Sequence, residues 1–197
     1  MPRFELSKFC FLFPDMDPEQ YDRLRDDIKE NGVSSAIVLW HDPEQGKLVI
    51  VDGRHRDKAC SELGIECPTR EFKGTAVDVA KHVISLNLSR RHLNAGQIAM
   101  AWAKANGIVA VYRNPGGATG RPKGEAKGSA YEIVGKEIGV SPATVNRATH
   151  VLRESPEKAE EVLSGKKGLI QAVKEIRKEK DDKIIDSRES ITDADDY

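Results

Sequence analysis

Two arginines and a histidine follow a glycine at the point where an apolar run meets a polar segment in the N-terminal half of the chain. Residues 49–56 read VIVDGRHR, which places Arg54, His55 and Arg56 directly after Gly53. A glycine lets the backbone approach a ligand closely, and the free amides at the start of a helix attract anions. Arginine binds phosphate oxygens through two parallel hydrogen bonds. The pattern therefore predicts a phosphate-binding loop.

A second basic segment, residues 87–92 (NLSRRH), follows a predicted helix and precedes Asn94, which is suited to cap the next helix. Its adjacent arginines, Arg90 and Arg91, would close on the same phosphate chain. Charged loop ends are common in proteins, however, and most are simply solvated. Each segment alone is weak support for a phosphate site, and with both present the two interpretations stay open.

The strongest local pattern in the C-terminal half is a pair of predicted helices joined by a glycine corner, at residues 130–147. Gly139 supplies the left-handed conformation that a tight turn requires, and Val140 would fill the corner. Ser141 is typical of a residue that caps a helix, and Pro142 is typical of a first helical turn. This arrangement predicts a helix-turn-helix.

The second helix of such a motif enters the major groove of DNA with its N-terminus first. Asparagine pairs with adenine and arginine with guanine, and each such contact gives ~1–3 kcal/mol of discrimination. The predicted DNA-contacting residues of this helix are Ser141, Ala143, Thr144, Asn146 and Arg147. Thr144 suits a phosphate or a thymine methyl group. The alternative is an ordinary helical hairpin in a bundle, and the basic residues that precede the motif favour DNA binding.

Charge is unevenly distributed along a chain that is almost neutral overall. Its 31 lysines and arginines and 32 acidic residues give a formal net charge of −1, so total charge does not indicate a polyanion partner. Residues 104–153 are nonetheless basic, and residues 181–197 are acidic. Glycine and proline in residues 114–129 predict a flexible loop. The DNA-contact candidates of this loop are Arg121, Lys123 and Lys127. They would contact the DNA backbone or a minor groove, or remain solvated.

Hydrophobic spacing and helix caps predict the elements that position these residues. In the N-terminal half we expect an extended entry, a helix, a β-hairpin, a helix ended by Gly64, an edge strand and another helix, at 4–13, 18–31, 36–40 with 47–51, 54–63, 68–72 and 76–88. In the C-terminal half we expect helices at 95–105, 130–139, 141–153, 156–164 and 169–180. The pair Asn106-Gly107 is expected to end the first of these.

The order of these elements, together with three short motifs, resembles the ParB/sulfiredoxin-like domain and the helix-turn-helix of ParB proteins. Residues 52–56 (DGRHR) resemble the phosphate loop of that family, and residues 87–94 (NLSRRHLN) are similar to the segment that closes its pocket. Residues 12–14 (LFP) stand near the place of its first nucleotide-contact motif, and residues 165–173 (GKKGLIQAV) follow in the order seen in ParB proteins. The resemblance covers residues 4–177.

The resemblance implies an α+β fold, in which a small mixed ParB/sulfiredoxin-like domain precedes an all-α helix-turn-helix domain. The expected boundaries are 1–94 for the nucleotide-pocket domain, 95–178 for the helical DNA-binding domain with a flexible basic loop at 113–129, and 179–197 for an acidic, disordered tail.

In ParB proteins the pocket binds CTP with Mg²⁺ and couples it to clamping on DNA. The residues to which the resemblance assigns nucleotide contacts are Gly53, Arg54, His55, Arg56, Asn87, Ser89, Arg90 and Arg91, with Asn87 as the candidate metal ligand. This chain departs from the family's pattern at Leu86, which replaces an acidic candidate magnesium ligand, and in its loosely matched first motif. From the resemblance we expect no dimerisation domain in the residues after the helix-turn-helix, so a clamp would need another interface.

The same resemblance leaves enzymatic alternatives open. Sulfiredoxins carry their catalytic cysteine at the loop position where this chain has Arg54, so sulfinic-acid repair is disfavoured. Related free-serine kinases share a DGHHR-like loop, which keeps a phosphotransfer function as the alternative, alongside a nuclease or a weak nucleotide triphosphatase. A helix-turn-helix would have no use in such a kinase.

Composition disfavours several other classes of protein. No apolar run is long enough to span a bilayer, and residues 1–13 lack a secretion signal. The 3 cysteines, Cys10, Cys60 and Cys67, lack the spacing of a disulfide framework or a zinc site, so we expect buried thiols. The expected partners are double-stranded DNA, a nucleotide and a second copy in a homodimer, with no membrane. We expect a cytoplasmic, nucleoid-associated protein of plasmid or chromosome partition or of transcription regulation.

Overall fold

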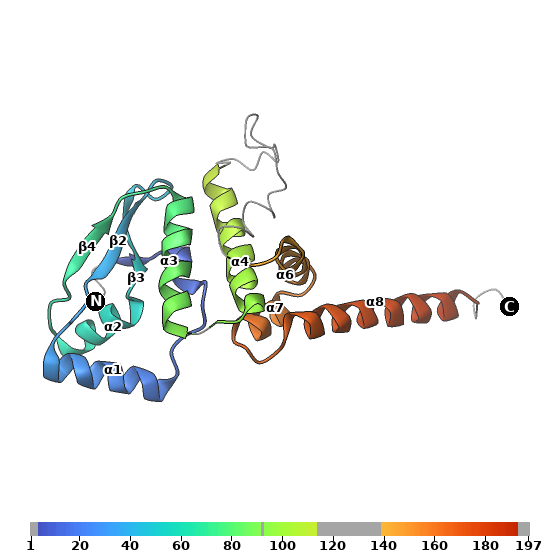
Figure 1. The fold of residues 1–197 in the computed structure, drawn as a ribbon, viewed down its shortest axis with the longest axis horizontal. Coiled ribbons are helices and arrows are strands. Elements are labelled where there is room, and N and C mark those ends of the chain that lie inside the picture. The colour runs from blue at the N-terminus through green and yellow to red at the C-terminus, as the bar shows by residue number, and fades with distance from the viewer. Residues whose placement is uncertain (1–3, 92, 114–138, 193–197) are drawn as a thin grey trace. The chain divides into compact units, whose positions relative to one another are not determined.

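The computed structural model describes residues 4–91, 93–113 and 139–192 (Figure 1). The chain forms two compact units, which are described separately. The N-terminal unit comprises residues 1–93 and 104–125, and the C-terminal unit comprises residues 94–103 and 126–197. Long helices are present, but none in the described part is both long and apolar enough to cross a membrane.

A four-stranded sheet forms the centre of the N-terminal unit, in the order β1-β3-β2-β4. Its strands are β1 (Glu5–Leu6), β2 (Ile37–Asp42), β3 (Lys47–Asp52) and β4 (Thr69–Phe72). β2 and β3 are antiparallel, whereas β1 pairs with β3 and β4 with β2 in parallel. The predicted β-hairpin and edge strand are therefore confirmed.

The hairpin turn is built around a buried carboxylate. Asp42 is fully buried, and its Oδ1 accepts the backbone N–H of Glu44 at 2.8 Å. Its Oδ2 accepts the side-chain amide of Gln45 at 2.9 Å and the hydroxyl of Tyr112 at 2.9 Å. A buried charge is tolerated only with such partners. The turn therefore also fixes Tyr112, which lies 70 residues further along the chain.

Helices pack around the sheet, and they occur along the chain in the order predicted from the sequence. α1 (Pro18–Asn31) starts at Asp17, whose side chain accepts the backbone N–H of Gln20 at 2.9 Å. α2 (Arg54–Leu63) ends at Gly64 in the left-handed conformation, as predicted. Buried Ile28 of α1 packs with Ala59 and Cys60 of α2. α3 (Ala76–Arg91) extends a few residues beyond its predicted end. All three cysteines are free thiols, but only Cys60 is buried as predicted, whereas Cys10 and Cys67 are half-buried.

The entry segment and the end of one helix differ from the prediction. A 3-10 helix, η1 (Lys8–Phe11), interrupts the expected extended stretch at 4–13. α4 (Ala95–Arg113) continues straight through Asn106-Gly107, so the predicted end at residue 105 is wrong. Glycine in a helix costs about 1 kcal/mol relative to alanine. Burial of Val109 and the contacts of Tyr112 with Phe9 and Trp40 outweigh that cost.

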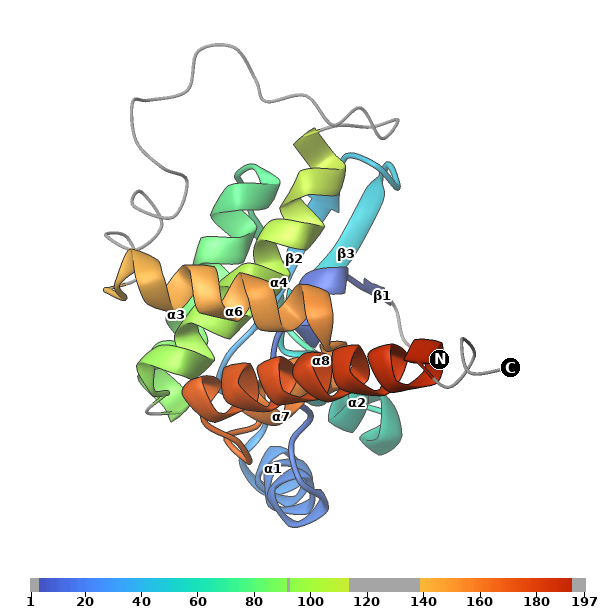
Figure 2. The ribbon, with the colours of Figure 1, turned by 90° about the vertical axis from the view of Figure 1, so that its right-hand side faces the viewer.

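The described part of the C-terminal unit is helical. Its further helices are α6 (Pro142–Glu154), α7 (Pro156–Leu163) and α8 (Leu169–Thr192). Figure 2 shows α6 and α8 side by side, and both pack against α7. The predicted end of α8 at residue 180 is wrong, because the helix continues to Thr192. The predicted helix 130–139 lies outside the described residues.

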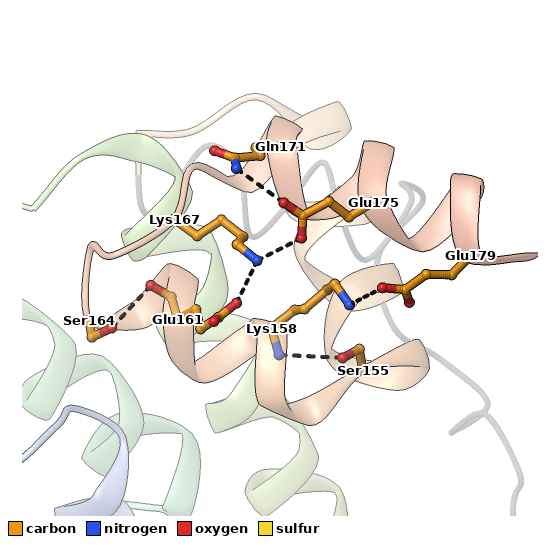
Figure 3. A network of polar contacts seen from close by, with 8 residues as sticks. All are labelled: Ser155, Lys158, Glu161, Ser164, Lys167, Gln171, Glu175 and Glu179. Carbon is orange, nitrogen blue, oxygen red and sulfur yellow. Dashed lines mark hydrogen bonds and ion pairs between the residues drawn. The ribbon is translucent and has the colours of Figure 1, made fainter.

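Ion pairs join α7 to α8 beside their apolar contact. Figure 3 shows Lys167 between Glu161 and Glu175, at 2.7 and 2.6 Å. Lys158 of α7 reaches Glu179 of α8 at 2.7 Å. Each of these pairs is at least partly exposed, and such pairs contribute little individually. Their number and arrangement orient α8 rather than determine its stability.

Candidate functional site

A cavity of about 670 Å³ lies within the N-terminal unit, where the end of β3 meets α1, α2 and α3. The predicted nucleotide-binding residues that line it are Gly53, Arg54, His55, Arg56 and Asn87. The structure thus brings together the DGRHR loop and Asn87, the first residue of the second basic segment. The side chains of Ser89, Arg90 and Arg91 lie outside the described residues, although their backbone belongs to α3.

Gly53 shapes the floor of this cavity. It occupies the N-cap of α2 with φ at 94°, a conformation that favours glycine, and no side chain caps the helix there. A Cβ atom at this position would lie 2.8 Å from Nη2 of Arg56 and 2.9 Å from Ile37. The first amides of a helix have no partner within the helix. The start of α2 therefore presents an uncapped, positively polarised end at the cavity.

Arg54 supports the wall of the cavity. Its guanidinium donates to the backbone carbonyls of Cys10 and Phe13, the latter at 3.2 Å. It also lies 2.8 Å from the carboxylate of Asp15, and only 12% of its side chain is exposed. Most of its donors therefore hold residues 10–15 in place rather than point at open solvent.

Arg56 is held in a similar way. Its Nη2 donates to Oδ2 of Asp52 at 3.0 Å and to the carbonyl of Ala36 at 3.3 Å. Its Nε is buried and has no hydrogen-bond partner among the described residues. An unpaired buried donor is costly, and this N–H is closed off from solvent, so a ligand oxygen would reach it only if the guanidinium moved.

The remaining polar groups of the cavity are partly committed. Nε2 of His55 lies 3.1 Å from Asp15. The side-chain amide of Asn87 donates to the carbonyl of Val83 at 2.8 Å, which leaves its oxygen for other partners. The thiol of Cys10 donates to the carbonyl of Ile50 at 3.0 Å, and burial raises its pKa to about 12. Cys10 is therefore not a thiolate nucleophile at neutral pH.

Sequence reasoning did not identify several residues that line this cavity. They include Met16, Gln20 and Leu24, which come from α1 and the segment just before it. Leu24 is an apolar residue of α1, but nothing in the sequence shows that it reaches this cavity. Asp15, two residues before the cap of α1, was the available hint of a partner for a basic loop.

The second candidate site is the start of α6 in the C-terminal unit. Ser141 caps the helix, and its hydroxyl accepts the backbone N–H of Thr144 at 3.2 Å. The same hydroxyl lies 2.8 Å from Oγ1 of Thr144, so Thr144 is engaged in the cap. Gly139 has φ at 69°, the left-handed conformation that was predicted.

One face of α6 is buried and the other is open. Val145, Ala148 and Val151 are buried. The predicted DNA-contacting residues with exposed side chains are Ser141, Ala143, Asn146 and Arg147, and Thr144 is half-buried. The loop candidates Arg121, Lys123 and Lys127 lie outside the described residues. The described candidates therefore form one accessible surface at the start of α6.

A metal centre made of protein side chains alone has no support in residues 4–91, 93–113 and 139–192. No group of three histidine, cysteine, aspartate or glutamate side chains there is arranged to hold an ion. The oxygen of Asn87 is the described candidate ligand at the cavity.

No protein-family model and no curated protein matches this sequence. Among solved structures, the chain is similar to a Pnob8-like ParB-N domain, with 16% identity, a TM-score of 0.55, and coverage of 93% of this chain and 80% of that one. The Caulobacter crescentus ParB chromosome-partitioning protein, C-terminally truncated, matches in complex with CTP-γ-S at 20% identity and a TM-score of 0.36, covering 83% of this chain and 82% of that one. The same protein on the centromeric parS site matches at 18% identity and a TM-score of 0.41, covering 81% and 74%.

The ParB-N domain is the comparison that bears on the fold, because its TM-score exceeds one half over nearly the whole chain. At 16% sequence identity, this similarity does not indicate which ligands the chain binds. The mixed α+β class predicted from the sequence is confirmed, and the chain has a ParB-like fold.

Proposed function

We propose that this chain is a DNA-binding protein of the ParB-like type, which reads duplex DNA with α6 and is regulated by a nucleotide in the N-terminal cavity. The observation that carries the proposal is the division of α6 into two faces. Its capped N-terminal turns expose Asn146 and Arg147, while Val145 on the opposite face is buried. A reading helix must present its first turns in this way to enter a major groove.

Asn146 and Arg147 are the residues that we assign to base reading. Asparagine recognises adenine and arginine recognises guanine through paired hydrogen bonds. Ser141 and Thr144 are committed to the helix cap, and they are better suited to a phosphate near the helix N-terminus. If the sequence-predicted helix at 130–139 precedes α6, the pair would form the helix-turn-helix.

The cavity in the N-terminal unit fits the triphosphate of a nucleotide such as CTP. The uncapped start of α2 and the close approach that Gly53 permits both favour an anion there. Arg54 would contribute only if it exchanged Asp15 or a carbonyl partner for phosphate. Ser89, Arg90 and Arg91 would close the same site.

Magnesium would be held mainly by the phosphates of the nucleotide, because Mg²⁺ binds through few protein ligands and keeps several waters. Asn87 would supply its amide oxygen. The neighbouring Leu86 cannot supply a ligand. The residues of the cavity therefore suit a nucleotide that brings its own Mg²⁺. They do not suit a metal site that the protein builds alone.

Catalysis has weaker support than binding. Among the described residues that line the cavity, Asp52 is the one carboxylate, and it is ion-paired with Arg56 at 3.0 Å. A general base needs a carboxylate that is available to accept a proton. We therefore place this chain with DNA-binding proteins of partition or transcription that act at the nucleoid in the cytoplasm, rather than with hydrolases or kinases.

The test combines a duplex titration over a salt series with a nucleotide scan in the presence and absence of Mg²⁺. We expect the logarithm of the association constant to fall steeply with the logarithm of salt, because phosphate contacts release counterions. We also expect one nucleoside triphosphate to bind without rapid turnover. Rapid turnover in the absence of duplex binding would instead identify an enzyme.

A further inference from the structure

A basic groove of about 370 Å³ lies between α6 and α8 in the C-terminal unit. Cations from both helices line it. Arg147 and Arg153 come from α6, and Arg177 and Lys180 come from α8. The groove also contains Asn146, so it begins at the residues that we assign to base reading.

The charge of this groove is only partly neutralised. Glu154 pairs with Lys180 at 2.6 Å and with Arg153 at 3.0 Å. Arg147 and Arg177 form no ion pair with any carboxylate of the described chain, and both are exposed. Glu154 thus pairs with two of the four cations, and no carboxylate is among the described residues that line the groove, so this lining is positively charged.

The groove has a rigid floor. Val173 and Ile176 of α8 line it and are 8% and 3% exposed, because they pack in the core of the unit. Away from the groove, Lys158 of α7 holds Glu179 of α8 at 2.7 Å (Figure 3). Because α8 packs directly against α6, the cations of α8 lie beside those of α6.

We propose that this groove binds the phosphodiester backbone of duplex DNA beside the bases that α6 reads, with Arg177 as a phosphate contact outside the helix-turn-helix. The inference rests on the proposed function and extends it to α8. A reading helix in the major groove has a phosphate strand along its flank, and cations fixed next to that helix set its register. The groove continues the surface that Asn146 and Arg147 form.

Glu154 then limits the affinity of this contact. Its carboxylate occupies Lys180 and Arg153, and hydrogen bonds from these two side chains lower its pKa, so it stays charged. A phosphate strand that entered the groove would have to compete with Glu154 for both cations. Removal of this one negative charge should therefore strengthen DNA binding.

The experiment uses the full chain and two duplexes, a selected site and a scrambled one, over a salt series. Arg177→Gln should weaken binding to both duplexes by about fivefold at 0.15 M salt and lower the salt slope by about 0.9, the contribution of one phosphate contact. Glu154→Gln should strengthen binding to both. Lys174→Gln is the matched control, because Lys174 is an exposed cation of α8 that does not line the groove.

Preference between the two duplexes should be unchanged in Arg177→Gln. If Arg177→Gln behaves like Lys174→Gln while Arg147→Ala alters preference, the groove proposal is overturned and the proposed function stands. If the unmodified chain binds neither duplex, the proposed function fails and the groove proposal fails with it. Thermal unfolding of each variant identifies any loss that is due to misfolding.

Discussion

The guanidinium of Arg54 lies 2.8 Å from the carboxylate of Asp15, and only 12% of the arginine side chain is exposed. Arg54, which the sequence pattern predicts to bind phosphate, therefore holds in place the segment that forms one wall of the cavity. A ligand in this cavity would compete with Asp15 for Arg54. Nucleotide binding and the position of residues 10–15 would then be coupled, since both depend on the same side chain.

Substitution of Asp15 should separate these two roles. Asp15→Asn removes the competing charge and leaves the carbonyls of Cys10 and Phe13 as partners of Arg54. We expect tighter nucleotide binding with little change in stability, because Asp15 is 78% exposed. Arg54→Ala should abolish nucleotide binding and lower the free energy of unfolding by about 1–3 kcal/mol, since two buried acceptors lose their donor. Calorimetric titration and denaturant unfolding would measure both effects, and weaker binding by Asp15→Asn would contradict the competition.

Gly107 provides a test of the continuous α4. A Cβ at this position meets nothing within 4 Å, and the residue lies inside the helix. Gly107→Ala should therefore raise the free energy of unfolding by up to about 1 kcal/mol. Gly64→Ala is the matched control and should be destabilising, because Gly64 has φ at 68° at the end of α2. If Gly107→Ala is destabilising as well, the helix ends where the sequence pattern places its end.

A pH dependence of stability follows from Asp57, which is 8% exposed. Burial raises the pKa of its carboxyl above the usual value. The folded state therefore binds a proton more tightly than the unfolded state, so the cost of the charged form is present at neutral pH and disappears as pH falls below the unfolded pKa. Asp57→Asn should raise the Tm at pH 7, and the difference should shrink as the pH is lowered. An equal difference at pH 7 and pH 3 would rule out this cause.

Local signals predicted the first half of the fold well. Asp17 and Pro18 mark the start of α1, the two apolar runs form β2 and β3, and Gly64 ends α2. Each of these signals acts through neighbours in the chain. A cap, a turn or an alternating pattern has the same physical consequence wherever the rest of the chain lies.

The sequence could not predict features that depend on distant contacts. Asn106-Gly107 is a normal helix stop, but Tyr112 bonds to Asp42, which is 70 residues away, and this packing extends α4. Arg54 likewise is a residue type that commonly binds phosphate. In the structure it donates to two backbone carbonyls, which lie 41 and 44 residues earlier in the chain. At the proposed DNA site the cap and the apolar face of α6 were predictable, whereas the groove with α8 needed the tertiary structure.

Base reading by α6 is the central claim, and selection of bound duplexes from a random pool tests it most directly. We predict that the unmodified chain enriches a defined sequence, and that Arg147→Ala loses about 1–3 kcal/mol of discrimination at one position while keeping the others. Lys174→Ala should select the same sequence as the unmodified chain. If Arg147→Ala enriches an identical sequence with identical preference at every position, α6 does not read DNA as proposed.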